Sequence, residues 1–328
     1  MRSLRKIMEI RFVHIEPERY ETVYHALSNA HQLAAREAQV LNAHCIVLSP
    51  DMVMADGSLA AVDRLATDGA RVVMSAGLRL CEETAIPALK ANGLLAGNPD
   101  ILRPRTLMRL ALDHLHPETE RLCFDSPQFI DNPVCLWSVG NDGLLLRSFH
   151  LHPLMIDLGS IKEPIDLRGD TIDGAFIGCS FGNWAEVCVE TDSDNILVFS
   201  LSSQADRSEP NRPRKANAAT LRRMAYRRNV TPMHRWFFTK AIKLHTTDLD
   251  VRWVQLEEST GLLAFHAMNI ARLSNSAAVR LLIDLLREHL AFHLEYSRVG
   301  RRLLALRRRV LQAVQRVRDP GRHRRRAS

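Results

Sequence analysis

The chain has 328 residues, 46% of them hydrophobic, and a formal net charge of +7. This length and composition suit a soluble globular protein with one large domain or two modest ones. No apolar run reaches the roughly 20 residues needed to cross a bilayer, and we expect no secretory signal. Six cysteines lie far apart with no Cys-x-x-Cys pair, which argues against a zinc knuckle or disulfide framework and favours a reducing cytoplasm.

The positive charge is concentrated at one end of the chain. Residues 298–328 contain 12 arginines and one acid, Asp319, for a net charge of +11, so the preceding 297 residues carry −4. Because the body is slightly acidic and shows no aromatic residues interleaved with basic ones, we expect no nucleic-acid partner. An RNA-binding protein that uses the arginine-rich end is a weaker alternative.

Strands and helices alternate in the first part of the chain. Strands are expected at 7–15, 45–48 and 71–75, and helices at 18–41, 59–67, 82–92 and 105–114. Such a series predicts a largely parallel α/β sheet with right-handed connections. Further strands are expected at 134–139, 144–155, 184–189 and 195–200. The sequence Gly140-Asn141-Asp142-Gly143 predicts a hairpin turn between the first two of these.

The last third is expected to be mostly helical. Residues 202–217 favour a mobile loop, and helices are predicted at 220–228, 232–245 and 277–296. In residues 299–317, apolar side chains recur at alternating spacings of four and three among many arginines. A basic amphipathic helix of this kind is typical of proteins that lie on an anionic membrane surface. A dimerising or solvated helix, followed by a disordered basic end at 320–328, explains the same pattern.

The segment 45–56 carries the first candidate site. Its apolar run ends in Ser49-Pro50-Asp51 and is followed by Asp56-Gly57-Ser58, a turn and helix-start signal. This arrangement predicts the Asp51 carboxylate at the carboxyl end of a buried strand, where open α/β sheets bind ligands. Carboxylate oxygens there suit a hard divalent cation and the phosphates it carries. A strand-to-helix turn with a solvated Asp51 is the alternative.

His150 and His152 form the second candidate site. Side chains two residues apart in a strand share a face, so the two imidazoles are expected to point together. Such a pair can supply half of a transition-metal site, or one metal ligand beside one substrate contact. Two histidines on the solvated face of an edge strand are the alternative. Pro153 predicts that this strand ends there, near a loop.

Two acid-rich turns complete the candidates. Asp170 and Asp173 can hold a sugar hydroxyl, position a metal or act as a base. Alternatively, Asp170 caps a short helix and Asp173 is solvated. The acid-rich segment 190–194 lies between two strands and is expected to be an ordinary turn. The absence of Gly-x-Ser-x-Gly, P-loop and Gly-x-Gly-x-x-Gly motifs argues against serine hydrolases, nucleotide triphosphatases and dinucleotide-dependent enzymes.

Together these segments resemble GT-A type nucleotide-sugar-dependent glycosyltransferases, over residues 20–201. Residues 46–51, followed by 56–59, resemble the strand that ends in the family's Asp-x-Asp motif and its next helix. The segments 149–154, 170–173 and 192–194 resemble those of uncharacterised bacterial glycosyltransferase-like proteins. Of the Asp-x-Asp motif only Asp51 matches, because Ser49 occupies the first carboxylate position.

The resemblance implies roles for these residues. In the family, the last Asp of the motif holds a Mn²⁺ or Mg²⁺ ion that bridges the diphosphate of the nucleotide sugar, and a downstream His often completes the metal shell. Carried over, this assigns Ser49 and Asp51 to the donor, and Asp51 with His150 or His152 to the metal. Asp173 or Asp170 is the expected base that deprotonates the acceptor hydroxyl.

A GT-A-like fold implies a mixed, mainly parallel sheet flanked by helices. The expected organisation is an N-terminally short α/β domain at 1–201, a mobile loop at 202–217, a helical region packed on the core at 218–297 and a basic tail at 298–328. The implied reaction transfers a sugar to a glycan or lipid-linked acceptor, in the cytoplasm or at the inner face of the membrane. The alternative is a non-catalytic binding protein on a degenerate scaffold, which Ser49 and the short front half favour.

Overall fold

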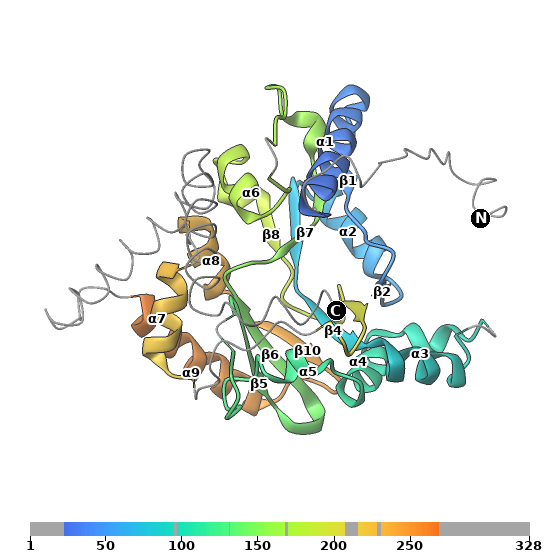
Figure 1. Cartoon of the computed structure of the whole chain (residues 1–328), viewed down its shortest axis with the longest axis vertical. Helices are drawn as coiled ribbons and strands as arrows, with labels where there is room; N and C mark the ends of the chain where they lie inside the picture. The colour runs from blue at the N-terminus through green and yellow to red at the C-terminus, as the bar shows by residue number, and fades with distance from the viewer. Residues whose placement is uncertain are drawn as a thin grey trace, which may run out of the picture. The chain divides into compact units, whose positions relative to one another are not determined.

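The computed structural model describes residues 23–94, 97–130, 132–167, 170–206, 216–227 and 231–268. Within these ranges the expected α/β class is confirmed, because mixed sheets are flanked by helices (Figure 1). Several predicted segments lie outside the described residues: the strand at 7–15, the helix at 277–296, the basic helix at 299–317 and positions 207–215 of the predicted loop.

The central sheet has the strand order β1–β7–β3–β8. Its strand β3 (Val72–Ser75) is buried at all four residues, as its run of apolar and small side chains predicts. This strand pairs antiparallel with β7 (His152–Ile156) and parallel with β8 (Val187–Val189). The edge strand β1 (Cys45–Ile46) pairs antiparallel with β7.

Two further sheets have three strands each. The second sheet consists, in spatial order, of β2 (Met52–Met54), β9 (Val198–Ser202) and β4 (Gly77–Cys81). The third consists of β10 (Ile242–His245), β6 (Gly143–Ser148) and β5 (Val134–Ser138). Five of the seven strand pairs described are antiparallel, so the expected predominance of parallel pairs is wrong. The reason is that consecutive strands such as β1 and β2 enter different sheets instead of crossing over within one.

Two extended segments pass directly from one sheet to another. Strands β3 and β4 are separated only by Ala76, where the chain leaves the central sheet for the second. Strands β6 and β7 are separated only by residues 149–151, where the chain passes from the third sheet to the central one. The strand predicted at 144–155 is therefore two strands, each with different partners.

Pro153 lies at the start of β7 and not after the end of a strand, as its sequence position suggested. It is paired with Met74, and the register between β7 and β3 shifts between Val73 and Met74. A proline cannot donate a ladder hydrogen bond, and an irregularity of this kind is where a sheet tolerates one.

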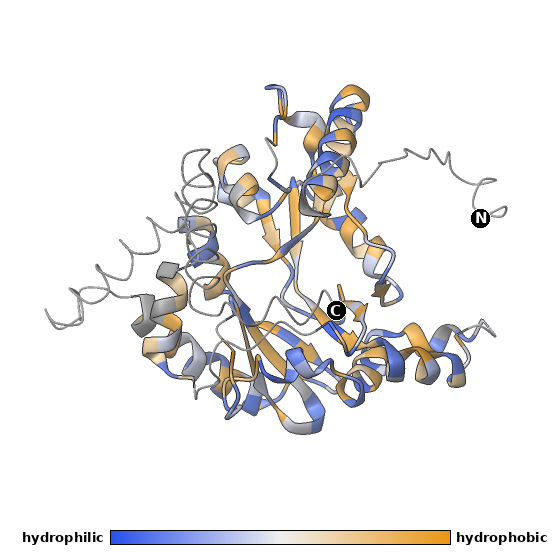
Figure 2. Cartoon of the chain, in the orientation of Figure 1, coloured by the Kyte–Doolittle hydropathy of each residue, from blue (hydrophilic) through white to orange (hydrophobic). Residues whose placement is uncertain are grey.

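The helices begin and end close to the predicted positions in the first half. Their bounds are α1 (Val23–Leu41), α2 (Ser58–Thr67), α3 (Glu82–Ala91), α4 (Pro104–Asp113), α5 (Pro117–Glu120), α6 (Gly174–Ser180), α7 (Ala218–Arg227), α8 (Pro232–Thr239) and α9 (Val251–Met268). Single 3₁₀ turns are η3 (Pro99–Leu102), η4 (Gly140–Asp142), η5 (Leu158–Ser160) and η6 (Trp184–Glu186). Figure 2 shows β7 and β8 as mainly hydrophobic, whereas α1 alternates between hydrophobic and hydrophilic residues.

The helix predicted at 232–245 is shorter than expected. It ends at Thr239 because Lys240 has extended backbone angles, and the residues that follow form β10, which pairs antiparallel with β6. The C-terminal region therefore contributes a strand to the third sheet as well as helices. The predicted hairpin around 140–143 is confirmed, since η4 joins the antiparallel strands β5 and β6.

The buried guanidinium of Arg147 connects the third sheet to the helices α8 and α9. Arg147 on β6 is only 2% exposed. Its guanidinium donates hydrogen bonds to the carbonyl oxygens of Thr239 (2.7 Å) and Glu257 (2.9 Å) and to Oγ1 of Thr260 (3.0 Å). Because the Thr239 carbonyl lies at the carboxyl end of α8, the helix dipole stabilises a positive charge there.

We expect Arg147→Lys to lower the free energy of unfolding by about 2–4 kcal/mol, because one ammonium cannot satisfy acceptors that lie in several directions and leaves buried oxygens without donors. Urea denaturation measures the change. The control is Arg64→Lys, since Arg64 is exposed on α2. Equal destabilisation by both substitutions would contradict the structural role of Arg147.

Candidate functional site

A cleft lies where the two extended segments change sheets. Its volume is 410 Å³, and its lining includes Ala76, between β3 and β4, and Leu151, between β6 and β7. Three imidazoles, three hydroxyls and one carboxylate form most of its polar lining: His31, His150, His152, Ser75, Ser148, Thr171 and Asp173. The cleft therefore brings His150, His152 and Asp173 of the sequence-predicted site together, and adds His31 from α1.

His152 is the first residue of β7 and is paired in register with Ser75 at the end of β3. Its side chain is open to solvent on one side, yet crowding by protein atoms lowers its pKa, and the charge of Asp51 partly opposes this effect. Burial, followed by the proximity of His152, also lowers the pKa of His31, whose Nδ1 accepts a hydrogen bond from the Ile172 N–H at 3.2 Å. Both imidazoles are therefore neutral at pH 7.

The strand that precedes Asp51 differs from the buried strand expected there. β1 is an edge strand of two residues, and the side chains of Ile46 and Leu48 are 43% and 48% exposed. The apolar run at 45–48 is therefore not the core of a parallel sheet. Its apolar character misled the prediction because single exposed apolar residues are common on protein surfaces.

Asp51 and Ser49 lie in the turn between β1 and β2. Asp51 is half-buried, and its carbonyl oxygen accepts a hydrogen bond from the Leu201 N–H at 2.8 Å. Ser49 is exposed, and its carbonyl oxygen accepts from the Met52 N–H at 3.1 Å. Asp51 lies near enough to His152 for its charge to act on that imidazole, but neither it nor Ser49 lines the cleft.

His150 precedes β7 and does not share a strand with His152. Its ring contacts the ring of His234 on α8, with the two centroids 4.5 Å apart. Among the described residues, the group whose donor atoms converge closely enough to hold a metal ion is Asp192, Asp194 and His245, and it does not include Asp51, His150 or His152.

His234 is held in one neutral form. Its Nδ1 accepts a hydrogen bond from the Thr231 N–H at 3.1 Å, as part of the capping box of α8. Burial, followed by the neighbouring His150, lowers its pKa to about 4, and Asp173 opposes this shift. The proton therefore resides on Nε2, which is buried and has no hydrogen-bond partner. A Cβ at Gly174 would come within 2.7 Å of this nitrogen, so only glycine fits there.

The two acids of the turn at 170–173 have exchanged the roles that their sequence suggested. Asp173 caps α6, since its Oδ1 accepts a hydrogen bond from the Phe176 N–H at 3.2 Å, and it also lines the cleft. Asp170 is exposed, and its carbonyl oxygen accepts a hydrogen bond from Ser28 Oγ on α1. Of the two expected bases, Asp173 alone lines the cleft.

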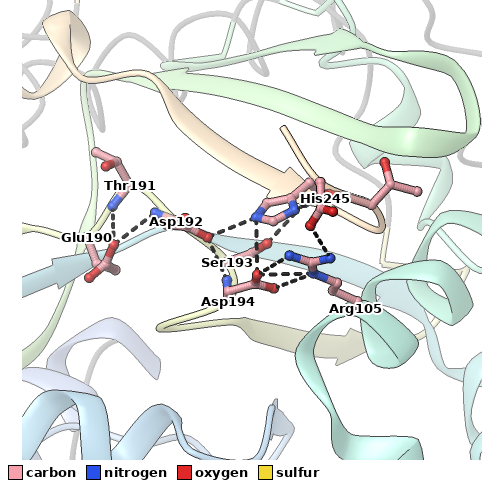
Figure 3. A network of polar contacts seen from close by, with 9 residues as sticks. Arg105, Glu190, Thr191, Asp192, Ser193, Asp194 and His245 are labelled. Carbon is pink, nitrogen blue, oxygen red and sulfur yellow. Dashed lines mark hydrogen bonds and ion pairs between the residues drawn. The ribbon is translucent and has the colours of Figure 1, made fainter. Parts of the chain in front are cut away.

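A second polar group follows the strand β8 (Figure 3). Asp192, Asp194 and His245 each offer one ligand atom, and these atoms lie within 4.8 Å of one another. The carboxyl ends of the parallel neighbours β3 and β8 meet at one edge of the central sheet, where the Glu190 N–H donates to the Met74 carbonyl oxygen at 3.0 Å. The acid-rich turn thus leaves the sheet beside the end of β3, whose last residue lines the cleft.

His245 ends β10 and is only 1% exposed. Its Nε2 lies 2.9 Å from Oδ1 of Asp192, and its Nδ1 lies 2.6 Å from the carbonyl oxygen of Thr247. Burial opposes the charge on His245, but the bonds to Asp192 and Thr247 together raise its pKa. Because a carbonyl oxygen can only accept, Nδ1 carries a proton, and the proton on Nε2 is the one that a metal ion would displace.

Arg105 on α4 already neutralises part of this group. Its Nε and Nη2 donate to the Asp194 carboxylate at 3.1 and 2.8 Å, and its Nη1 donates to Asp248 at 2.7 Å (Figure 3). This forked arrangement is the strong, charge-assisted kind of ion pair. It accounts for the position of Asp194 without any metal ion.

Sequence reasoning did not bring these residues together. The sequence favours an ordinary turn at 190–194, and the helix that it predicts at 232–245 ends at His245. The available signal is the Asp-x-Asp spacing of Asp192 and Asp194 shortly after a strand, which supplies two carboxylates where Ser49 and Asp51 supply one.

Comparison of the chain with family models, with curated proteins and with solved structures gives no match. None of the helices within the described ranges combines the length and apolar character needed to span a bilayer.

The buried neutral His234 should make the fold sensitive to acid. Because its pKa is about 4 instead of the ordinary 6.5, the unfolded chain takes up a proton first as the pH falls. This proton uptake removes about 3 kcal/mol of stability between pH 6.5 and pH 4. His234→Asn keeps an acceptor for the Thr231 N–H but does not titrate. Between pH 6.5 and pH 4, we therefore expect the unfolding free energy of this variant to fall by about 3 kcal/mol less than that of the unchanged protein.

Urea denaturation of both proteins at several pH values measures this difference. The control is His44→Asn, since His44 is exposed. An unchanged pH dependence in His234→Asn would show that folding does not lower the pKa of His234.

Proposed function

We propose that the protein is a glycosyltransferase that moves a sugar from a nucleotide-sugar donor to a glycan or lipid-linked acceptor with the help of a divalent metal ion. The observation that supports this most is the convergence of Asp192, Asp194 and His245 at the edge where β3 and β8 end. This edge is where α/β sheets bind their ligands. The nearby end of β3 lines a cleft that contains a carboxylate and three imidazoles.

The donor atoms of this group suit Mn²⁺ or Mg²⁺. Two carboxylates are hard oxygen ligands, and one imidazole beside them favours Mn²⁺. The Nδ1–H of His245 donates to the Thr247 carbonyl oxygen, which is the second hydrogen bond that typically orients a metal-binding imidazole. When bound, such an ion would stabilise the negative charge that develops on the leaving diphosphate.

The chain's own residues supply the remaining chemistry. Arg105 is a permanent cation beside Asp194, and its guanidinium fork also matches a phosphate. Asp173 faces the cleft and is our candidate for the base that takes the proton from the acceptor hydroxyl. His152 is neutral at pH 7 and can both donate and accept a hydrogen bond, which suits a sugar hydroxyl.

We expect Asp192→Asn and Asp194→Asn each to lower Mn²⁺-dependent release of the nucleotide from UDP- or GDP-sugars by more than about 100-fold. The basis is that even the outer hydrogen-bond partners of metal ligands cost 10–100-fold. Electron paramagnetic resonance measures Mn²⁺ binding in parallel, and the Asp192→Asn protein should not bind the ion.

Asp248→Asn is the matched control, because it removes a charge from the same arginine at a residue that is 92% exposed and outside the metal group. Asp51→Asn tests the alternative set of metal ligands, which is Asp51 with His150 or His152. Loss of Mn²⁺ binding in Asp51→Asn, with binding retained in Asp192→Asn, would assign the metal to Asp51.

A non-catalytic binding protein is the second candidate function. The ion pairs of Arg105 with Asp194 and Asp248 favour it, because they balance the acid-rich turn without a metal ion. Calorimetric titration with UDP, GDP and Mn²⁺ separates the two functions. Absence of heat with all three ligands supports the binding protein.

A further inference from the structure

The carboxylate of Asp194 belongs to the metal group (Asp192, Asp194 and His245) and is already bound by Arg105 (Figure 3). Its Oδ2 accepts hydrogen bonds from Nε and Nη2 of Arg105 at 3.1 and 2.8 Å. The same oxygen lies 4.0 Å from Nε2 of His245. Its Oδ1 also accepts from Nε of Arg105, at 3.1 Å. Arg105 therefore contacts both of the oxygens that Asp194 can offer to a metal ion.

The backbone around the metal group is held by hydrogen bonds that do not involve Arg105. The Asp194 N–H donates to Oδ1 of Asp192 at 2.8 Å. The His245 N–H donates to Oγ of Ser193 at 3.0 Å, which ties the end of β10 to the acid-rich turn. We therefore expect the ligand atoms to stay in place when Arg105 is replaced or moves away.

Arg105 can change its partner without a movement of the backbone. It lies in the first turn of α4, and the buried residues Leu107, Met108 and Ala111 fix this helix in the core. The Arg105 side chain itself is 41% exposed. Because exposed side chains change rotamer quickly, its guanidinium is a movable cation on a fixed helix.

We propose that Arg105 competes with the divalent ion for Asp194, and that a phosphate-bearing ligand relieves this competition by binding the guanidinium. The inference rests on the proposed function and adds a regulation of its metal site. A guanidinium beside Asp194 neutralises the charge that attracts the ion and also repels the ion. A phosphate presents acceptor oxygens to the guanidinium fork as a carboxylate does, so Arg105 can exchange one for the other. Ion and phosphate therefore bind cooperatively, each strengthening the other by the same factor.

Binding of Mn²⁺ alone to the full chain, measured by electron paramagnetic resonance at constant pH, tests the competition. We expect Arg105→Gln to bind Mn²⁺ about fivefold more tightly than the unchanged protein. This factor is at the low end of typical couplings, because Arg105 and Asp194 are 41% and 36% exposed and solvent screens their charges. Unchanged or weaker binding in Arg105→Gln, or no Mn²⁺ binding by either protein, overturns the proposal.

Two further variants separate this competition from an effect of net charge. Arg103→Gln removes a cation that is 70% exposed and pairs with Asp100, so it should leave Mn²⁺ affinity unchanged within about twofold. Arg105→Lys keeps the charge, so it should bind Mn²⁺ less tightly than Arg105→Gln. Thermal unfolding verifies that each variant keeps its fold. Equal gains in affinity for Arg103→Gln and Arg105→Gln would refute the role of Arg105.

Inorganic phosphate tests the second half of the proposal. We expect phosphate to tighten Mn²⁺ binding to the unchanged protein, and this gain should be lost in Arg105→Gln. A titration without protein corrects for the complexes that the ion forms with phosphate. Equal gains in both proteins, or no gain in the unchanged protein, would contradict the exchange of Asp194 for phosphate.

The outcome is separable from that of the proposed function, because these measurements require no sugar transfer. Tighter Mn²⁺ binding by Arg105→Gln, in a protein that transfers no sugar, would keep the competition and remove the enzyme. Sugar transfer by the unchanged protein, together with weaker Mn²⁺ binding by Arg105→Gln, would remove the competition and keep the enzyme.

Discussion

The pairing of strand β3 constrains both polar groups of this protein. All four of its residues are buried, and it lies between an antiparallel partner, β7, and a parallel partner, β8. The first pairing places His152 beside Ser75, and the second carries Glu190 to the same end of the strand. Because β3 is buried and pairs with a strand on each side, its position between β7 and β8 is fixed by the core. The cleft and the acid-rich turn are therefore positioned by the core.

The two groups offer different electrostatic environments. Around Asp192 and Asp194, the carboxylates are balanced by Arg105 and by His245, whose pKa is raised. In the cleft, burial instead lowers the pKa of His31 and His152. Histidine thus serves as a cation in one place and as a neutral hydrogen-bonding group in the other. The difference arises because a carboxylate and a carbonyl oxygen accept hydrogen bonds from the ring of His245 and outweigh its burial, whereas burial is the largest effect on His31 and His152.

Local sequence patterns predicted the elements whose partners are near or whose burial is complete. The buried strand β3 and the amphipathic helix α2 are where apolar spacing put them. Features that depend on distant pairing were missed. Nothing near His245 indicates that β10 pairs with β6 and so brings this imidazole to Asp192. Likewise Pro153 reads as a strand end, because the register shift that accommodates it is formed with β3. Asp173, not Asp170, caps α6, although either acid could begin a short helix.

The sheet connectivity also has a consequence for how the chain acquires its structure. Most strand pairs join distant segments, as when Met52 pairs with Ser200 and Cys45 with Ile156. Among the pairs described, β5 with β6 forms the one hairpin. Topologies dominated by such non-local contacts fold slowly, because loop closure costs entropy before the contacts form. During synthesis the strands β1 to β4 are made before their partners β7, β8 and β9, and their unpaired edges are open to aggregation until those partners emerge.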